Sequence, residues 1–112
     1  MIEISEDLQE AIRCIARATP DVEVCGILYN KSFIKLKNES RYPDRMFEVK
    51  QLPRLPRPIT AFVHSHPRGA NGWPSSLDWK FAWTTGLPQV LYLYDEDKFV
   101  QYNAGCQDTK LI

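Results

Sequence analysis

The sequence lacks an excess of charge of either sign. Its 112 residues include 14 lysines and arginines and 14 aspartates and glutamates, so the formal net charge is zero, and the basic residues are scattered along the chain. A protein that binds a nucleic acid backbone or an anionic lipid surface usually gathers its basic residues on one face. We therefore expect neither nucleic acid nor a membrane as a partner.

A long apolar stretch is also missing. No run approaches the roughly 18 to 20 residues needed to cross a bilayer, and residues 1–13 are acidic and amphipathic, unlike a secretory signal peptide. We expect a cytoplasmic protein. The chain length, together with 44% hydrophobic and 25% charged side chains, predicts a single globular domain over residues 1–112.

Cysteine is scarce. Cys14, Cys25 and Cys106 form neither an even set nor a CxxC pair, which argues against a disulfide framework and against an all-thiolate zinc site. We expect all three to be small buried hydrophobic side chains. The sequence also has no internal repeat and no low-complexity segment.

The first part of the chain predicts a helix followed by a hairpin. Ser5 is a suitable N-cap for an amphipathic helix that runs to about Ala18 and ends before Pro20. Residues 22–30 combine apolar and β-branched side chains and predict a strand. Residues 32–38 are its predicted antiparallel partner.

The middle of the chain predicts a connector and then a central strand. Residues 39–58 are polar and carry four prolines, which cannot donate backbone hydrogen bonds in a sheet. We expect one short strand inside this connector, at residues 46–50. Residues 59–66 are apolar enough for a central strand, and residues 68–73 predict a loop that contains glycine.

The rest of the chain predicts one more helix and two strands. A serine pair can cap the start of a helix over residues 75–85, and Gly86 can end it. Residues 89–94 and 98–103 predict strands joined by a charged turn. This order of elements predicts a mixed β-sheet with helices packed on it, in the α/β or α+β class.

His64 and His66 are the only two histidines, and they lie at the carboxyl end of the predicted central strand. Side chains two residues apart point to the same face of a strand, so the two imidazoles converge above the sheet. This is a metal-ligand geometry, although the pair alone fits a polar strand end equally well.

Asp78 favours the metal site. It lies 12 residues after His66, in the first turn of the next predicted helix, whose start faces the end of the strand. Two imidazoles and one carboxylate leave the fourth tetrahedral position open for water, as in catalytic zinc sites. The alternative is an acidic residue that is favoured there by the helix dipole.

Glu23 is a carboxylate in the middle of an otherwise apolar predicted strand, on the face shared with Cys25 and Ile27. It is either a solvated residue near the strand end or a side chain directed at a polar partner. Water on a zinc ion is such a partner, and Glu23 would then be its general base.

Ser75 precedes Asp78 by three residues, so its hydroxyl should lie near the metal and could stabilise an oxyanion. The alternative is a plain helix N-cap. The pair Ser75 and Ser76 could also divide the two tasks.

These residues form a pattern that resembles the JAMM signature of the JAB/MPN zinc metalloproteases. The matching parts are Glu23, the HxHP segment at residues 64–67 and the SxxD segment at residues 75–78. The resemblance implies a cytidine-deaminase-like α/β sandwich, a mixed sheet flanked by helices. It also implies a bound Zn²⁺ and the following roles: metal ligands His64, His66 and Asp78, general base Glu23, and oxyanion donor Ser75.

Within that family the chain is most similar to the compact prokaryotic and phage JAB domains, particularly the N-terminal domain of tail assembly protein K of lambda-like phages. One departure is that seven residues, not six, separate Pro67 from Ser75, so the extra residue must be absorbed, at Gly69 or Gly72. The long insertions with which eukaryotic relatives grip ubiquitin are also missing. The resemblance implies a polypeptide substrate, a tail protein or a ubiquitin-like protein. It places a phage-encoded chain in the host cytoplasm or the virion tail.

Three functions can be compared on this basis. The first is a zinc-dependent peptidase or isopeptidase. The second is a non-catalytic structural or assembly module, such as a tail-tip component, that retains the fold and the metal. The third, nucleoside deamination, requires a glutamate at the position of His66 and a later CxxC pair, and neither is present.

Overall fold

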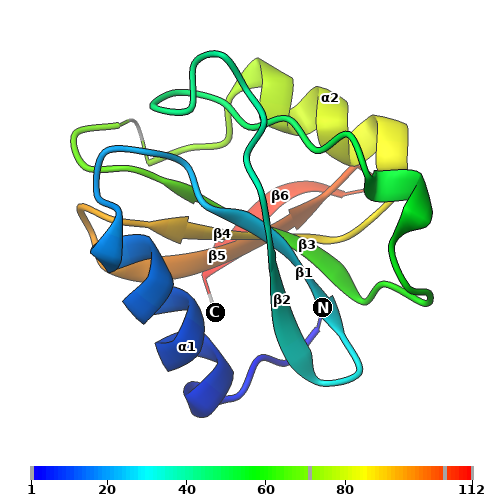
Figure 1. Ribbon diagram of the computed structural model, residues 1–112. Helices are drawn as coiled ribbons and strands as arrows, with labels where there is room; N and C mark the ends of the chain where they lie inside the picture. Colours follow the sequence, from blue (N-terminus) through cyan, green and yellow to red (C-terminus); the bar gives the residue numbers. More distant parts are fainter. Residues whose placement is uncertain (1, 71, 105, 112) are drawn as a thin grey trace.

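The fold is a mixed β-sheet with a helix on each face (Figure 1). The computed structural model describes residues 2–70, 72–104 and 106–111, with residues 106–110 described by their backbone alone. Its elements in chain order are α1 (Glu6–Ala18), β1 (Cys25–Tyr29), β2 (Ser32–Leu36), the 3-10 helix η1 (Leu52–Arg54), β3 (Ala61–His66), α2 (Ser76–Thr85), β4 (Gln89–Leu93), β5 (Lys98–Asn103) and β6 (Cys106–Leu111).

In the described part of the chain, the strand order is β2-β1-β3-β4-β5-β6. β3 and β4 pair in parallel, and α2 forms the connection between them, whereas every other neighbouring pair is antiparallel. The parallel pair places the carboxyl end of β3 beside that of β4. The predicted α/β class and mixed sheet are confirmed, and β3 is a central strand as expected.

The two faces of the sheet are covered differently. α1 packs Ile12 and Ala16 against one face, where they join Val63 and Val90 in a buried cluster. The other face is covered by α2 and by the connector over residues 39–58, which run side by side in Figure 1. Because side chains alternate along β3, the side chains of Phe62, His64 and His66 all lie under α2 and the connector.

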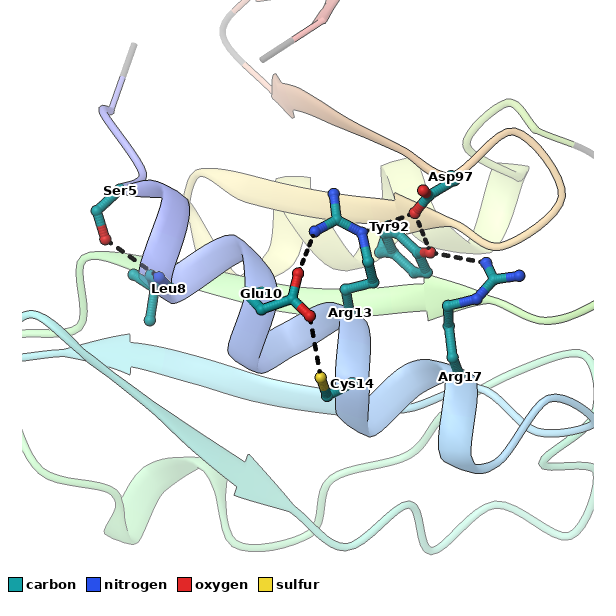
Figure 2. A network of polar contacts seen from close by, with 8 residues as sticks. All are labelled: Ser5, Leu8, Glu10, Arg13, Cys14, Arg17, Tyr92 and Asp97. Carbon is teal, nitrogen blue, oxygen red and sulfur yellow. Dashed lines mark hydrogen bonds and ion pairs between the residues drawn. The ribbon is translucent and has the colours of Figure 1, made fainter.

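Helix α1 is fixed at its start and along its outer side. Ser5 Oγ accepts the N–H of Leu8, which confirms the predicted cap. Figure 2 shows how arginines of α1 hold the turn between β4 and β5. Arg13 donates to Asp97, and Arg17 donates to the hydroxyl of Tyr92, which itself donates to Asp97. These contacts lie on the α1 face, away from the histidines.

Several expectations for strands were wrong. Residues 46–50 do not form a strand, since their backbone is tied to residues 38 and 39 partly through the side chain of Asn38. β1 begins only at Cys25, so Glu23 lies before the strand and not in its middle. A further strand, β6, follows the two that were predicted at the end of the chain.

The expectation for the cysteines holds only in part. Cys25 is fully buried, as predicted. Cys14 is exposed, because it lies outside the apolar stripe of α1, and its thiol donates to Glu10. The side chain of Cys106 lies outside the described residues. Over that described part of the chain, neither helix has the length and apolar character needed to span a membrane.

Candidate metal centre

Strand β3 delivers two imidazoles to one face of the sheet. His64 and His66 alternate with Val63 and Ser65, whose side chains lie on the α1 side. Both histidines are buried. The His64 ring packs against Phe47 of the connector, with ring centroids 4.8 Å apart, so the connector holds one side of the imidazole in place.

Asp78 comes from the first turn of α2. It forms a capping box with Ser75: the N–H of Ser75 donates to Asp78 Oδ2 at 2.9 Å, and the N–H of Asp78 donates to Ser75 Oγ at 3.2 Å. This pair of hydrogen bonds fixes the carboxylate at the start of the helix. Because the loop after β3 returns to the sheet at this point, the carboxylate meets both histidines.

The three side chains converge closely. His66 Nε2 lies 2.9 Å from Asp78 Oδ2, and His64 Nε2 lies 3.3 Å from Asp78 Oδ1. One possible ligand atom from each residue lies within 4.8 Å of the others. Burial by itself would raise the pKa of Asp78, but His64 and His66, with the backbone N–H of Ser75, hold that pKa well below its usual range. The carboxylate is therefore ionised.

Buried polar atoms without partners test whether a metal ion fits this group. His64 Nδ1 and Nε2 are buried without a clear hydrogen bond among the described residues, and Asp78 Oδ1 lies 3.3 Å from Nε2. An imidazole buried in this way costs free energy unless something binds it. Two imidazoles and a carboxylate match the donor set of catalytic zinc sites. The residues that are present therefore fit a divalent cation.

Glu23 lies beside this group, on the neighbouring chain segment. Cys25 pairs with His64, and the N–H of Ser65 donates to Val24 O, so the same antiparallel pairing brings Glu23 across from His66. The Glu23 side chain is 5% exposed, and Oε1 has no hydrogen-bond partner among the described residues. Burial, reinforced by the negative charge of Asp78, raises the pKa of Glu23 to about 8.

Ser75 lies at the exposed start of α2 and is its N-cap, as one of the two interpretations predicted. Ser76 is the first residue of the helix and is exposed as well. In the preceding loop Gly69 adopts a φ of +82°, a conformation that favours glycine. Gly69 is one of the two glycines at which the extra loop residue was expected to be accommodated, and that expectation remains a prediction.

Sequence reasoning missed the aromatic side chains that surround the centre. Phe47, in the connector, packs against His64 and Phe81. Tyr102, on β5, is buried with its ring edge-on to His64, and its hydroxyl has no partner among the described residues. The alternation of apolar residues in 98–103 could have placed Tyr102 on a buried face, but not beside a histidine.

No family model and no curated protein matches this chain. Several solved structures are similar to it, including the following two. A protein from Desulfitobacterium hafniense, solved in solution, has a TM-score of 0.69 at 19% identity and covers 100% of this chain and 90% of its own. A JAB1/MPN domain protein from Archaeoglobus fulgidus has a TM-score of 0.63 at 20% identity. The match covers 99% of this chain and 94% of that protein's chain. At these identities the likeness shows the fold: an α/β fold shared with a JAB/MPN protein.

Proposed function

We propose that this chain is a zinc-dependent metallopeptidase or isopeptidase of the JAMM type. The observation that carries the proposal is the convergence of His64, His66 and Asp78 beside the buried side chain of Glu23, whose Oε1 has no hydrogen-bond partner among the described residues. The likeness to a JAB/MPN protein supports it by fold. A buried carboxyl group with no hydrogen-bond partner destabilises the protein, which suggests that it is retained for a chemical task.

Zinc is the proposed cofactor, held by His64, His66 and Asp78. The chemistry that a bound zinc ion supplies is Lewis acidity, which polarises the scissile carbonyl and lowers the pKa of the attacking water. The protein contributes the rigid placement of the three ligands. Two come from a central strand and the third from a capped helix start, so none depends on a loop for its position.

Glu23 is the general base in this proposal. Its Oε1 accepts a proton from the attacking water as the water oxygen bonds to the carbonyl carbon. The same carboxyl group then gives that proton to the leaving nitrogen as the C–N bond breaks. One water is consumed, and the products are a carboxylic acid and an amine.

Ser75 stabilises the negative charge that develops on the carbonyl oxygen. Its Oγ already accepts the N–H of Asp78, so the hydroxyl proton is left over for donation. The capping box places that hydroxyl next to the proposed ligand Asp78. The two interpretations of Ser75, helix cap and oxyanion donor, are therefore compatible in one residue.

The connector has backbone groups that could pair with an extended substrate. Asn38 Nδ2 donates to Met46 O, and the N–H of Glu39 donates to Glu48 O. Within the described residues the backbone of Phe47, between these two, takes part in no hydrogen bond. An extended peptide can pair with such a backbone by β-augmentation. We propose that a polypeptide substrate, a phage tail protein or a ubiquitin-like protein, binds there.

A structural role without catalysis, for example in a phage tail tip, is the second candidate. Two exposed tryptophans favour it, because Trp73 is 68% and Trp83 is 76% exposed and large exposed aromatics often mark binding surfaces. The buried Glu23 argues against it, since a buried carboxyl oxygen without a hydrogen-bond partner among the described residues costs stability and a scaffold gains nothing from it.

The experiment that tests hydrolysis compares zinc-loaded wild type with Glu23→Gln. Both proteins are incubated with the products of neighbouring genes, and new termini are identified by mass spectrometry. Because Gln cannot accept the proton, cleavage should fall by roughly 10²- to 10⁴-fold while zinc content stays the same. Full biological activity of Glu23→Gln, with zinc bound and no substrate processed, would establish the structural role instead.

A further inference from the structure

A groove of about 310 Å³ lies between the connector and α2, directly beside the candidate metal centre. Apolar side chains line both of its walls: Met46 and Phe47 line it from the connector, and Leu77 and Phe81 line it from the helix. Asp78, one of the proposed metal ligands, lines it as well. Pockets that bind small molecules measure about 300 to 1,000 Å³, so this groove is large enough for one bulky side chain and part of its neighbour.

Two cationic side chains stand on opposite walls of this groove, Arg45 on the connector and Lys80 on α2. Within the described residues neither forms an ion pair, and the guanidinium of Arg45 lies over the ring of Tyr42. The connector carboxylates Asp44 and Glu48 pair with neither cation. A positive charge therefore remains available at the groove of a chain whose overall charge is zero.

The chemistry of hydrolysis assigns a direction to the substrate. Glu23 lines a separate pocket, together with Lys35 and Asn38, and not the groove. Since Glu23 gives its proton to the leaving amine, the amine part departs on the Glu23 side. Ser75 lines the groove and donates to the carbonyl oxygen, so the acyl part of the substrate occupies the groove.

We propose that this groove makes the enzyme selective for a polypeptide that carries a bulky apolar side chain next to an acidic residue on the acyl side of the scissile bond. This inference rests on the proposed hydrolytic function. Charge complementarity carries it: Arg45 and Lys80 attract a carboxylate at the rim, while Phe47 and Phe81 accept an apolar side chain between them. A basic segment would be repelled.

Binding can be tested without cleavage, in zinc-loaded Glu23→Gln. The probes are two synthetic peptide libraries that are identical except that Asp or Asn follows a fixed Phe. We expect the Asp library to bind about tenfold more tightly at low salt, with the preference decreasing as salt screens the charges. Lys80→Glu or Arg45→Glu should abolish or reverse the preference. Arg54→Glu, the same change on the exposed basic residue of η1, should retain it.

Cleavage of the same libraries by zinc-loaded wild type separates this inference from the proposed function. Cuts that are enriched on the carboxyl side of the Phe-Asp segment support both the hydrolytic function and the proposed selectivity of the groove. Equal cutting of the two libraries keeps the hydrolytic function and overturns the charge selection. Preferential binding of the Asp library without any cutting overturns hydrolysis but supports the selection. Equal binding, or no binding by either library, overturns the selection.

Discussion

Asp78 Oδ2 lies 2.9 Å from His66 Nε2 and accepts the Ser75 N–H at the same distance. One oxygen therefore takes part both in the contact with a histidine and in the capping box that begins α2. The start of the helix and the candidate metal centre are one structural unit, and changes at Asp78 should affect both in separable ways.

Substitutions at Asp78 should separate the helix cap from the metal ligand. Asn keeps an oxygen that can accept from Ser75, so Asp78→Asn should keep the helix cap, while it loses the negative charge that His64 and His66 contact and lowers zinc affinity by at least about 100-fold. Asp78→Ala should lose the same affinity and, in addition, about 1 kcal/mol of stability. Zinc titration and thermal unfolding of the metal-free proteins measure the two effects. Zinc bound as tightly by both variants as by wild type would contradict the ligand role.

Removal of metal should weaken the fold without abolishing it. The proposed ligands lie on a central strand and a helix that share apolar contacts of their own, so the protein does not depend on the ion for a core. Chelation should lower the melting temperature while circular dichroism at 25 °C stays native. Complete unfolding by the chelator would instead indicate a structural zinc.

Metal-free stability should depend on pH through Glu23. Burial raises the pKa of Glu23 from its ordinary value of 4.5 to about 8, so the folded state holds a proton that the unfolded state releases. The favourable contribution is complete below pH 4.5 and is lost as pH rises toward 8. Glu23→Gln removes this titration. It should melt at least about 5 °C above wild type at pH 9 and close to it at pH 4.

The two serines at the start of α2 form a matched pair. Ser75→Ala should slow hydrolysis by about 10²-fold through the lost oxyanion donor and cost about 1 kcal/mol through the lost cap. Ser76→Ala, a change at the exposed next position, should do neither. If Ser75 is only a helix cap, Ser75→Ala should lower stability but leave the rate of hydrolysis per folded molecule unchanged.

The buried hydroxyl of Tyr102 should contribute nothing to metal-free stability. It has no hydrogen-bond partner among the described residues, so Tyr102→Phe should leave the free energy of unfolding unchanged or raise it by about 1 kcal/mol. Tyr92→Phe is the control, because the Tyr92 hydroxyl joins Arg17 to Asp97. That change should lower stability by about 1 kcal/mol. Urea unfolding of both variants gives the comparison.

Local sequence signals predicted the helices and the central strand. The caps at Ser5, Ser75 and Gly86 depend on a few neighbouring residues, and the alternation along residues 61–66 placed both histidines on one face. The convergence of those histidines with Asp78 followed from the short connection between strand and helix. These features are local, which explains why they could be predicted.

The environment of Glu23 could not be predicted, because it depends on distant segments. The N–H of Glu23 donates to Pro43 O, and the N–H of Val24 donates to the side-chain oxygen of Ser65. Neither N–H group therefore donates to the backbone of a neighbouring strand. The strand therefore begins at Cys25. The roles of Glu23 and Ser75 remain predictions, whereas the packing of Phe47 and Tyr102 on His64 emerged only from the fold.

The short span between His66 and Asp78 has a consequence for the order of folding. These residues are 12 positions apart, whereas the contact that brings the Glu23 segment to β3 joins Val24 to Ser65 across 41 positions. Closing the shorter loop costs less chain entropy. We therefore expect the contact between β3 and the start of α2 to form before the Glu23 segment pairs with β3, so that the proposed ligands meet before the proposed base joins them.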